Sequence, residues 1–357
     1  MWDVAVVGAG LSGIVCARRL LAAGYSVCIL DKSRGLGGRI ATRRVSDRIR
    51  VDHGLRYWQP KSEAIEPLTE ELIEAGVLKV WAHSDYEIRK KGILTQIDAP
   101  APKYISADGM SAISKYLLRQ FERGKNLFTN HRAVEIRREG EAWTIRCETG
   151  EVVKAKKCAI AIPASQAADL LQTIQTEPAD PVCELIKPAL ESLRAVNYFP
   201  CLTVMAGYEQ SRYAEMGELD SQGWAVTDYV GTSTDWIALD SSKRSNPKAD
   251  PVIVIHSKPD FATQYLDATD TQPAASVLLR ANSRRFKLPW LAQPEWFQIQ
   301  RWRYAHVKTP YSQTAHPITN TLICGGDWCV AHDTHSEYTS IDHAYRSGLS
   351  LAEHIQR

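Results

Sequence analysis

Three glycines near the start of the chain have the spacing of a phosphate-binding turn. The segment from Gly8 to Gly13 follows a short, mostly β-branched apolar run, Val4 to Val7. Gly8 permits a tight turn, Gly10 lets the backbone approach a pyrophosphate, and Gly13 lets the next helix pack against the strand. The free N–H groups and the positive dipole end of that helix favour phosphate. The pattern predicts a dinucleotide site formed by Gly8, Gly10, Leu11, Ser12 and Gly13.

An acidic residue follows at the distance expected for ribose binding. Helical spacing from Ile14 to Ala23 leads into a second predicted strand, Val27 to Leu30, which ends at Asp31. Asp31 lies 18 residues beyond Gly13, where a carboxylate accepts both ribose hydroxyls and repels a 2′-phosphate. This disfavours NADP as the tightly bound dinucleotide and leaves NAD and FAD.

A second glycine motif separates these two cofactors. Gly37-Gly38-Arg39 closes the segment that begins at Lys32, and it resembles flavoproteins of the amine-oxidase superfamily. In those proteins the glycines let the backbone pass close to the cofactor, and the arginine neutralises pyrophosphate charge. The resemblance implies non-covalent FAD and assigns Lys32, Gly37, Gly38 and Arg39 to it. Other arginines of this basic stretch, such as Arg43 and Arg44, are expected to be solvated.

Later segments resemble renalase-like flavoproteins, particularly the bacterial members, over essentially the whole chain. These segments are 52–58, 109–113, 301–305 and 324–329. The resemblance implies that Val134 meets the adenine through its backbone, although a plain hairpin with 142–147 explains that strand equally well. It implies that Asp327 accepts a hydroxyl of the cofactor, the alternative being an acid in a glycine-rich turn. The FAD contacts it implies are His53, Gly54, Leu55, Val134, Gly326, Asp327 and Ile341.

The same resemblance implies a reaction. Isomeric forms of NAD(P)H would pass a hydride to flavin N5, oxygen would reoxidise the flavin to give hydrogen peroxide, and ordinary NAD(P)+ would be released as metabolite repair. The side chains assigned to the substrate are Arg56, Tyr57, Trp302, Tyr304 and His343, and aromatic residues suit a flat substrate. His256 is the candidate catalytic residue, although a lone histidine at a strand end is more often structural.

The chain departs from the renalase-like pattern at three places. Leu55-Arg56 replaces Ala-Gln, His343 replaces a glycine, and residues 331–339 form an apparent insertion with His332, Asp333 and His335. The insertion is expected to be a lid or a surface loop, and no metal site is expected.

Two alternatives therefore stay open. One is an amine or other small-molecule oxidase of the same superfamily, whose usual flavin-facing lysine has no counterpart that the sequence identifies. The other is a non-catalytic FAD-binding protein in which Arg56 and His343 close the substrate face.

The element pattern predicts an α/β fold with two domains. A Rossmann-like FAD-binding domain is expected from residues 1–60, 101–165 and 299–357. A mostly antiparallel α+β substrate domain, of the amine-oxidase and p-hydroxybenzoate-hydroxylase type, is expected from 61–100 and 166–298. Strand candidates in the second domain are 201–206, 224–228 and 252–256, and the polar segment 241–251 is expected to be a surface loop.

Composition narrows the class of protein. The 357 residues are 44% hydrophobic and 24% charged, with a net charge of +2, which is the balance of a globular protein and disfavours a nucleic-acid binder. The eight cysteines form no CxxC pair and are expected to be buried free thiols. With no leader and no long apolar run, we expect a cytoplasmic protein without membrane contact. Its expected partners are a small molecule (a nicotinamide dinucleotide or an amine) and molecular oxygen.

Overall fold

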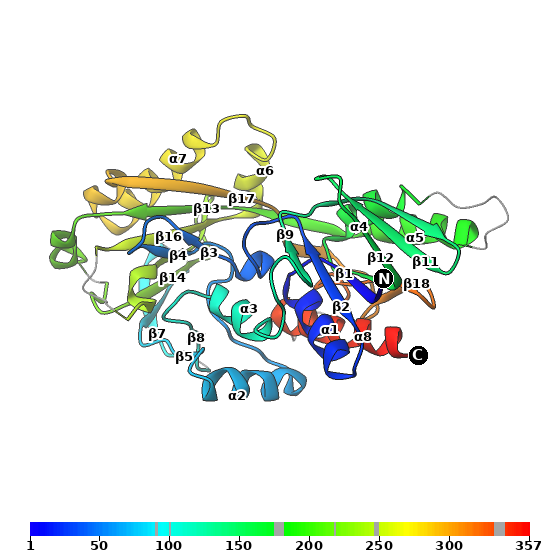
Figure 1. Cartoon of the computed structure of the whole chain (residues 1–357). Helices are drawn as coiled ribbons and strands as arrows, with labels where there is room; N and C mark the ends of the chain where they lie inside the picture. Colours follow the sequence, from blue (N-terminus) through cyan, green and yellow to red (C-terminus); the bar gives the residue numbers. More distant parts are fainter. Residues whose placement is uncertain (90–91, 100, 175–181, 218, 246–249, 332–339) are drawn as a thin grey trace.

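The computed structural model describes residues 1–89, 92–99, 101–174, 182–217, 219–245, 250–331 and 340–357. Figure 1 shows two β-sheets next to each other, each with helices packed on it, and both chain termini near the first sheet. The helices are α1 (Leu11–Ala22), α2 (Glu66–Glu74), α3 (Ser111–Leu117), α4 (Ala164–Leu171), α5 (Val182–Ala195), α6 (Pro259–Gln264), α7 (Gln272–Phe286) and α8 (Ser340–Gln356).

The first sheet contains the predicted nucleotide-binding strands. Its order is β10-β11-β12-β1-β2-β9, and β19 pairs with both β12 and β18. Strands β19, β12, β1, β2 and β9 run parallel, so their carboxyl ends meet at one edge, where open α/β sheets bind ligands. The bounds are β1 (Trp2–Val7), β2 (Val27–Asp31), β9 (Leu127–Thr129), β10 (Ala133–Glu139), β11 (Ala142–Cys147), β12 (Val152–Ile160), β18 (His316–Thr319) and β19 (Leu322–Cys324).

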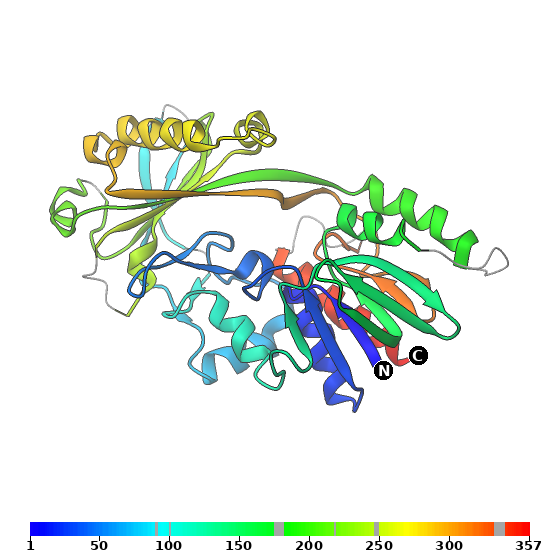
Figure 2. The same cartoon turned by 45° about the horizontal axis from the view of Figure 1, so that its top comes forward.

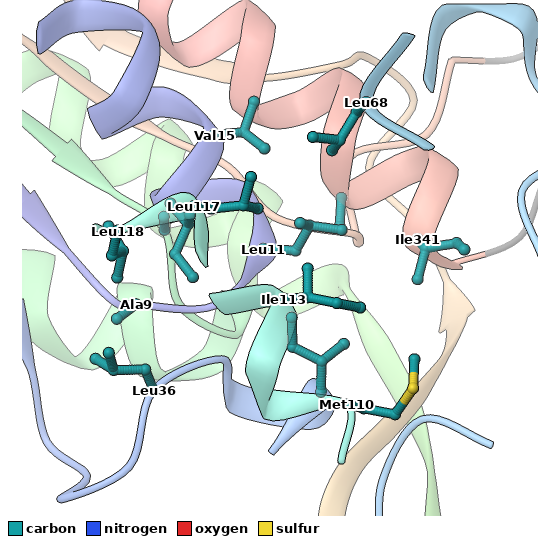
Figure 3. Packing of buried hydrophobic residues seen from close by; sticks show 14 of the residues in the cluster. Ala9, Leu11, Val15, Leu36, Leu68, Met110, Ile113, Leu117, Leu118 and Ile341 are labelled. Atoms are coloured by element: carbon teal, nitrogen blue, oxygen red, sulfur yellow. The ribbon is translucent and has the colours of Figure 1, made fainter. Parts of the chain in front are cut away.

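Helices cover both faces of this sheet, because its parallel strands are apolar on both sides. On one face α1 packs against α8 and α3, and Figure 3 shows Leu11 of α1 between Ile113 of α3 and Ile341 of α8. On the other face α4 and α5 bury an apolar cluster that includes Trp143 of β11.

The second sheet has the order β17-β13-β16-β15-β14-β6-β7 and is antiparallel except where β14 meets β6. One of its faces is buried under α6 and α7, and Figure 2 shows β13 and β17 as a long ribbon that runs from this sheet toward the first one. The strands are β6 (Ser84–Ile88), β7 (Leu94–Ile97), β13 (Asn197–Gly207), β14 (Trp224–Asp228), β15 (Thr234–Leu239), β16 (Val252–Ser257) and β17 (Trp296–Thr309); two small ladders pair β3 (Thr42–Arg44) with β4 (Arg50–Asp52) and β5 (Lys79–Val80) with β8 (Tyr104–Ile105).

The predicted fold class is confirmed: a Rossmann-like domain is combined with a mostly antiparallel α+β domain. The three strand candidates in the second domain are present as β13, β14 and β16. The helix predicted over 108–121 is shorter, since α3 ends at Leu117. In the described part of the chain no helix is both long enough and apolar enough to cross a bilayer.

Packing places some segments differently from the expected domain division. The expected division puts residues 166–195 in the substrate domain, but α4 and α5 pack on the first sheet. Helix α2 contacts α1 through an Arg18–Glu71 ion pair of 2.6 Å. Residues 299–309 belong to β17, which pairs along its length with β13. We propose that the nucleotide domain includes α2, α4 and α5 and that β13 and β17 are shared between the domains.

The segment 241–251, expected to be a surface loop, begins in the protein interior. Asp240–Lys243 forms a 3₁₀ turn, η5, in which Asp240 and Lys243 are completely buried. The Lys243 Nζ atom lies 2.8 Å from an oxygen of Asp240, and the Arg244 guanidinium bridges Asp240 and Asp52. Burial is tolerated because opposite charges are paired, which a polar sequence does not reveal. Residues 246–249 lie outside the described part.

The cysteines whose side chains the structure describes are buried free thiols, as predicted. The free cysteines are Cys16, Cys28, Cys147, Cys158, Cys201, Cys324 and Cys329.

Candidate cofactor and substrate site

A cavity of about 1490 Å³ opens at the carboxyl ends of the parallel strands and continues under β13 and β17. Pockets for drug-sized ligands have volumes of roughly 300–1,000 Å³, so this cavity has room for a dinucleotide and a second molecule. Its lining contains most of the predicted site residues: Gly8, Gly10, Leu11, Ser12, Asp31, Lys32, Gly37, Gly38, Arg39, His53, Gly54, Leu55, Arg56, Tyr57, Val134, His256, Trp302, Tyr304, Gly326, Asp327 and Ile341.

Two predicted site residues lie outside this lining. Gly13 lies behind it, and a Cβ atom there would be 2.0 Å from the Gly8 carbonyl oxygen, in keeping with the packing role predicted for it. His343, expected at the substrate face, is buried on α8 and does not line the cavity. Ser340, Ile341 and Ala344 line the cavity instead, because residues at such spacing share one helix face. The insertion residues 332–339 are outside the described part.

The first glycine turn fits a closely approaching ligand. Gly10 caps α1 with φ −76° and ψ 174°, a conformation open to any residue, and a Cβ atom there would meet nothing within 4 Å. Packing therefore does not require glycine at this position. The second glycine motif lies beside it, since the Gly37 N–H donates to the Ala9 carbonyl at 2.8 Å and Gly37 pairs with Gly10. The two motifs that the sequence separates form one backbone surface.

Asp31 is fixed at the edge of the cavity by backbone donors. One carboxylate oxygen accepts the Ala9 N–H and the other accepts the Ser33 N–H, each at 2.7 Å. Each oxygen of an ionised carboxylate has more than one acceptor site. Asp31 therefore keeps capacity for two ribose hydroxyls, as the sequence predicts.

Val134 lies at a β-bulge. In the ladder of β10 and β11, Ala133 pairs with Cys147 and Glu135 with Arg146, so Val134 is the extra residue. The bulged residue of such a pair is left out of the ladder, which gives its backbone freedom to meet a ligand. The hairpin with β11 is present, and the bulge leaves the Val134 backbone available for the adenine contact that the resemblance implies. The glycine surface, Asp31 and Val134 together fit the adenosine and pyrophosphate parts of FAD.

Arg39 and Asp327, predicted as separate cofactor contacts, form a pair with each other. The guanidinium donates to both carboxylate oxygens at 2.6 and 2.7 Å, and it also donates to the Tyr304 and Ala305 carbonyls of β17. Bidentate pairing of this kind fixes the orientation of both groups. The sequence offers no sign of it, because the two residues are 288 positions apart. The pair joins the second glycine motif to the Gly326 turn and to β17.

The far end of the cavity contains Arg56 and His256. The Arg56 Nε–H donates to His256 Nδ1 at 3.2 Å, and another guanidinium nitrogen forms an ion pair with Asp235. The guanidinium also lies over the Trp236 ring, 5.1 Å from its centroid. Burial, and next the charge of Arg56, hold the pKa of His256 well below its ordinary value. Asp235 was not predicted, since an isolated acid between Thr234 and Trp236 carries no recognisable motif.

Aromatic and imidazole rings flank the same end. The His53 ring stacks on Trp302 with centroids 5.3 Å apart and planes 14° apart, and the Trp302 N–H donates to the His53 carbonyl at 2.8 Å. Burial, and next the charge of Arg43, lower the pKa of His53 to about 4. His53 and His256 are therefore neutral at pH 7. Trp302 is a cavity-lining residue.

The buried neutral His53 predicts a loss of stability in acid. Its pKa is lower in the folded chain than in the unfolded chain, so unfolding takes up a proton once the pH falls below about 6.5. Stability is therefore complete above that pH and declines toward pH 4. Because of His53, we expect the free energy of unfolding to be about 2 kcal/mol lower at pH 5 than at pH 7. Urea unfolding at both pH values, at one fixed FAD concentration, measures the change.

His53→Phe is the control for this effect, because it preserves the stacked ring and removes the titrating group. The pH 7 to pH 5 difference in unfolding free energy is expected to shrink by about 2 kcal/mol in this variant. An unchanged difference would show that His53 does not titrate as described.

Comparison with known proteins agrees with the fold. The NAD(P)-binding Rossmann-like domain family matches residues 6–72, and the flavin containing amine oxidoreductase family matches residues 77–356. Putrescine oxidase bound to putrescine has a similar fold, with a TM-score of 0.70 and 15% identity over 100% of this chain and 99% of that one. Cyclohexylamine oxidase from Brevibacterium oxydans has a TM-score of 0.71 and 14% identity over 100% of both chains.

Sequence relatives match over shorter segments. The 4-hydroxybenzoate brominase (decarboxylating) of Marinomonas mediterranea is 23% identical over 147 residues, which are 41% of this chain and 22% of that protein. This relative and two putative flavin-containing monoamine oxidases of Mycobacterium tuberculosis are matched over about a quarter of their own length, from 22% to 26%. The family match, in contrast, covers most of this chain. The chain therefore belongs to the flavin containing amine oxidoreductases, a family of FAD-dependent oxidoreductases.

Proposed function

We propose that this protein is an FAD-dependent oxidase whose substrate is an isomeric dihydronicotinamide dinucleotide. FAD, when bound, supplies the hydride acceptor and passes the electrons to oxygen, which yields hydrogen peroxide. The product would be ordinary NAD(P)+. Membership of the family supports the FAD-dependent oxidation, and the composition of the cavity supports this class of substrate.

The observation that carries the proposal is the excess of positive charge along the cavity. The described lining includes nine cationic and four acidic residues, and two of the cations, Arg132 and Arg303, pair with Glu148 and Asp267 outside it, so seven cations remain against four acids. The pyrophosphate of FAD neutralises part of this excess, and a second phosphate-bearing ligand would neutralise more. An alkylammonium substrate would instead add to it. The cations are Lys32, Arg34, Arg39, Arg43, Arg44, Arg56, Arg132, Arg301 and Arg303, and the acids are Asp31, Asp169, Asp235 and Asp327.

The chain's own residues would orient both molecules. The glycine surface, Asp31 and Val134 would hold the adenosine end of FAD, and Ile341 at the start of α8 would face its other end. The stacked pair of His53 and Trp302 offers a flat apolar surface to the nicotinamide ring. Arg56 and His256, at the same end of the cavity, would recognise polar groups of that ring.

The test compares isomeric dihydronicotinamide dinucleotides with the corresponding ribosides, which lack phosphate. We expect kcat/KM to be about 10- to 100-fold lower for the ribosides, because charge-assisted hydrogen bonds to phosphate are lost. Added salt should narrow the difference, since it screens exposed charges. Equal kcat/KM for both substrate types would contradict the role given to the cationic lining.

Amine oxidation is the second candidate, and similarity of fold to putrescine and cyclohexylamine oxidases favours it. The lysine of the described lining is Lys32, which adjoins Asp31 at the nucleotide end. Lys243 is buried against Asp240 and is not part of that lining. Rapid peroxide production from simple amines, with no reaction of dihydronicotinamides, would establish this candidate and overturn the first.

A further inference from the structure

We infer that Arg56 is a positioning residue that holds His256 as a hydrogen-bond donor for a carbonyl oxygen of the substrate. Under the proposed function, that oxygen is the carboxamide oxygen of the dihydronicotinamide ring. This identification rests on the proposed function, whereas the state of His256 rests on contacts within the chain.

The hydrogen bond from Arg56 fixes the tautomer of His256. Arginine is a donor only, so the 3.2 Å hydrogen bond between Arg56 Nε and His256 Nδ1 requires that Nδ1 accepts. A neutral imidazole that accepts at Nδ1 carries its proton on Nε2. Arg56 thereby determines which ring nitrogen is the donor.

The surroundings of His256 keep its ring uncharged. His256 is 4% exposed and lies on β16. The groups that act on it are Arg56, Lys243 of η5, His306 of β17 and His53, all of which disfavour a further positive charge. Asp235, the acid nearby, is already paired with Arg56. Burial and these neighbours keep the imidazole neutral at pH 7, so it remains a donor at one nitrogen and an acceptor at the other.

The Nε2 donor of His256 is buried and lacks an acceptor within the described part of the chain. A buried N–H without an acceptor costs free energy, because its lost hydrogen bonds to water are not replaced. His256 lines the cavity, so a ligand in the cavity can supply the missing acceptor.

Arg56 is itself held in place by its neighbours. Its guanidinium is held by Asp235 and by the face of Trp236, and its carbonyl oxygen accepts from the buried Lys243 at 2.8 Å. Both ends of the residue are therefore fixed before a ligand arrives, and preorganised donors bind with less loss of entropy. The arrangement selects a neutral acceptor, such as an amide oxygen. An alkylammonium group cannot accept the bond and is repelled by Arg56.

The tautomer can be measured without substrate. In FAD-loaded protein labelled with ¹⁵N-histidine, we expect the His256 signals to show a pyrrole-type Nε2 and a pyridine-type Nδ1 at pH 7, with His256→Gln identifying those signals. In Arg56→Met both tautomers should be populated, because Nδ1 loses its donor. A proton on Nδ1 in the wild type, or an unchanged tautomer in Arg56→Met, would overturn the inference even if the proposed substrate is correct.

The substrate contact is tested by a matched pair of variants at position 256. Glutamine places an amide N–H close to the position of Nε2, whereas asparagine reaches only the position of Nδ1. With isomeric dihydronicotinamide dinucleotides, we expect His256→Asn to lower kcat/KM by about 10- to 100-fold and His256→Gln to restore most of it. Equal losses in both variants would overturn the donor role. If no dihydronicotinamide reacts with the wild type, the proposed function fails while the NMR result still decides the state of His256.

Discussion

Replacing Gly10 by valine is expected to remove FAD binding while the protein still folds. The Cβ atom would meet nothing within 4 Å, and φ −76° is open to valine. The cost to stability should stay at about 1 kcal/mol, the scale of an N-cap change. The side chain would, however, occupy the surface that we expect to hold the pyrophosphate. We expect FAD affinity to fall by at least 100-fold, or about 2.7 kcal/mol, measured by flavin fluorescence on titration of apoprotein.

Gly13→Ala is the contrasting variant in the same turn. Its Cβ atom would lie 2.0 Å from the Gly8 carbonyl oxygen and 3.2 Å from Ala161 Cβ. The backbone would have to move, so the apoprotein itself should lose stability, by roughly 1–3 kcal/mol or more. Wild-type FAD affinity in Gly10→Val, or equal destabilisation in both variants, would contradict the separate roles given to these glycines.

Replacing Arg244 by methionine is expected to destabilise the protein by about 3–5 kcal/mol, the cost of breaking a buried ion pair from one side. Its guanidinium contacts Asp240 at 2.7 Å and Asp52 at 2.9 Å, and it also donates to the Arg50 and Ser106 carbonyls. Burial raises the pKa of Asp52, but Arg244 and Lys243 outweigh burial and lower it. Without Arg244, two buried carboxylates would share Lys243 alone.

Arg212→Met is the matched control, because Arg212 pairs with Glu215 at 2.7 Å on the surface. Its expected cost is at most about 1 kcal/mol. Urea unfolding of both variants at pH 7 measures the contrast. A loss below about 1 kcal/mol in Arg244→Met would show that the cluster does not tie η5 to β4 as described.

Local patterns predicted the nucleotide-binding half well. The β1–α1–β2 unit and Asp31 lie within the first 31 residues, and turn chemistry and apolar periodicity determine them almost without reference to the rest of the chain. The same is true of the glycine turn after β19. Because the carboxyl ends of parallel strands meet at one edge, predicting the strands also predicted that these turns lie close together.

Pairings between distant segments could not be predicted in this way. Arg39 with Asp327 and Arg56 with His256 depend on how β17 and β16 lie over the first domain. The sequence around Lys243 is typical of a polar surface loop. Its burial and its pairing with Asp240 could not be predicted, because both depend on the folded chain. The resemblance implies that His343 faces the substrate. The orientation of α8 instead brings Ser340, Ile341 and Ala344 to the cavity.

Anaerobic bleaching of the flavin shows whether the FAD-loaded protein oxidises isomeric dihydronicotinamides. The protein would be mixed with a mixture of dihydronicotinamide isomers, with pure NADH and simple amines as parallel samples. We expect rapid loss of flavin absorbance with the isomers alone, and its return, with hydrogen peroxide, when air is admitted. Bleaching by amines but not by the isomers, or by neither, would contradict the proposed function while leaving the fold and the cofactor unchanged.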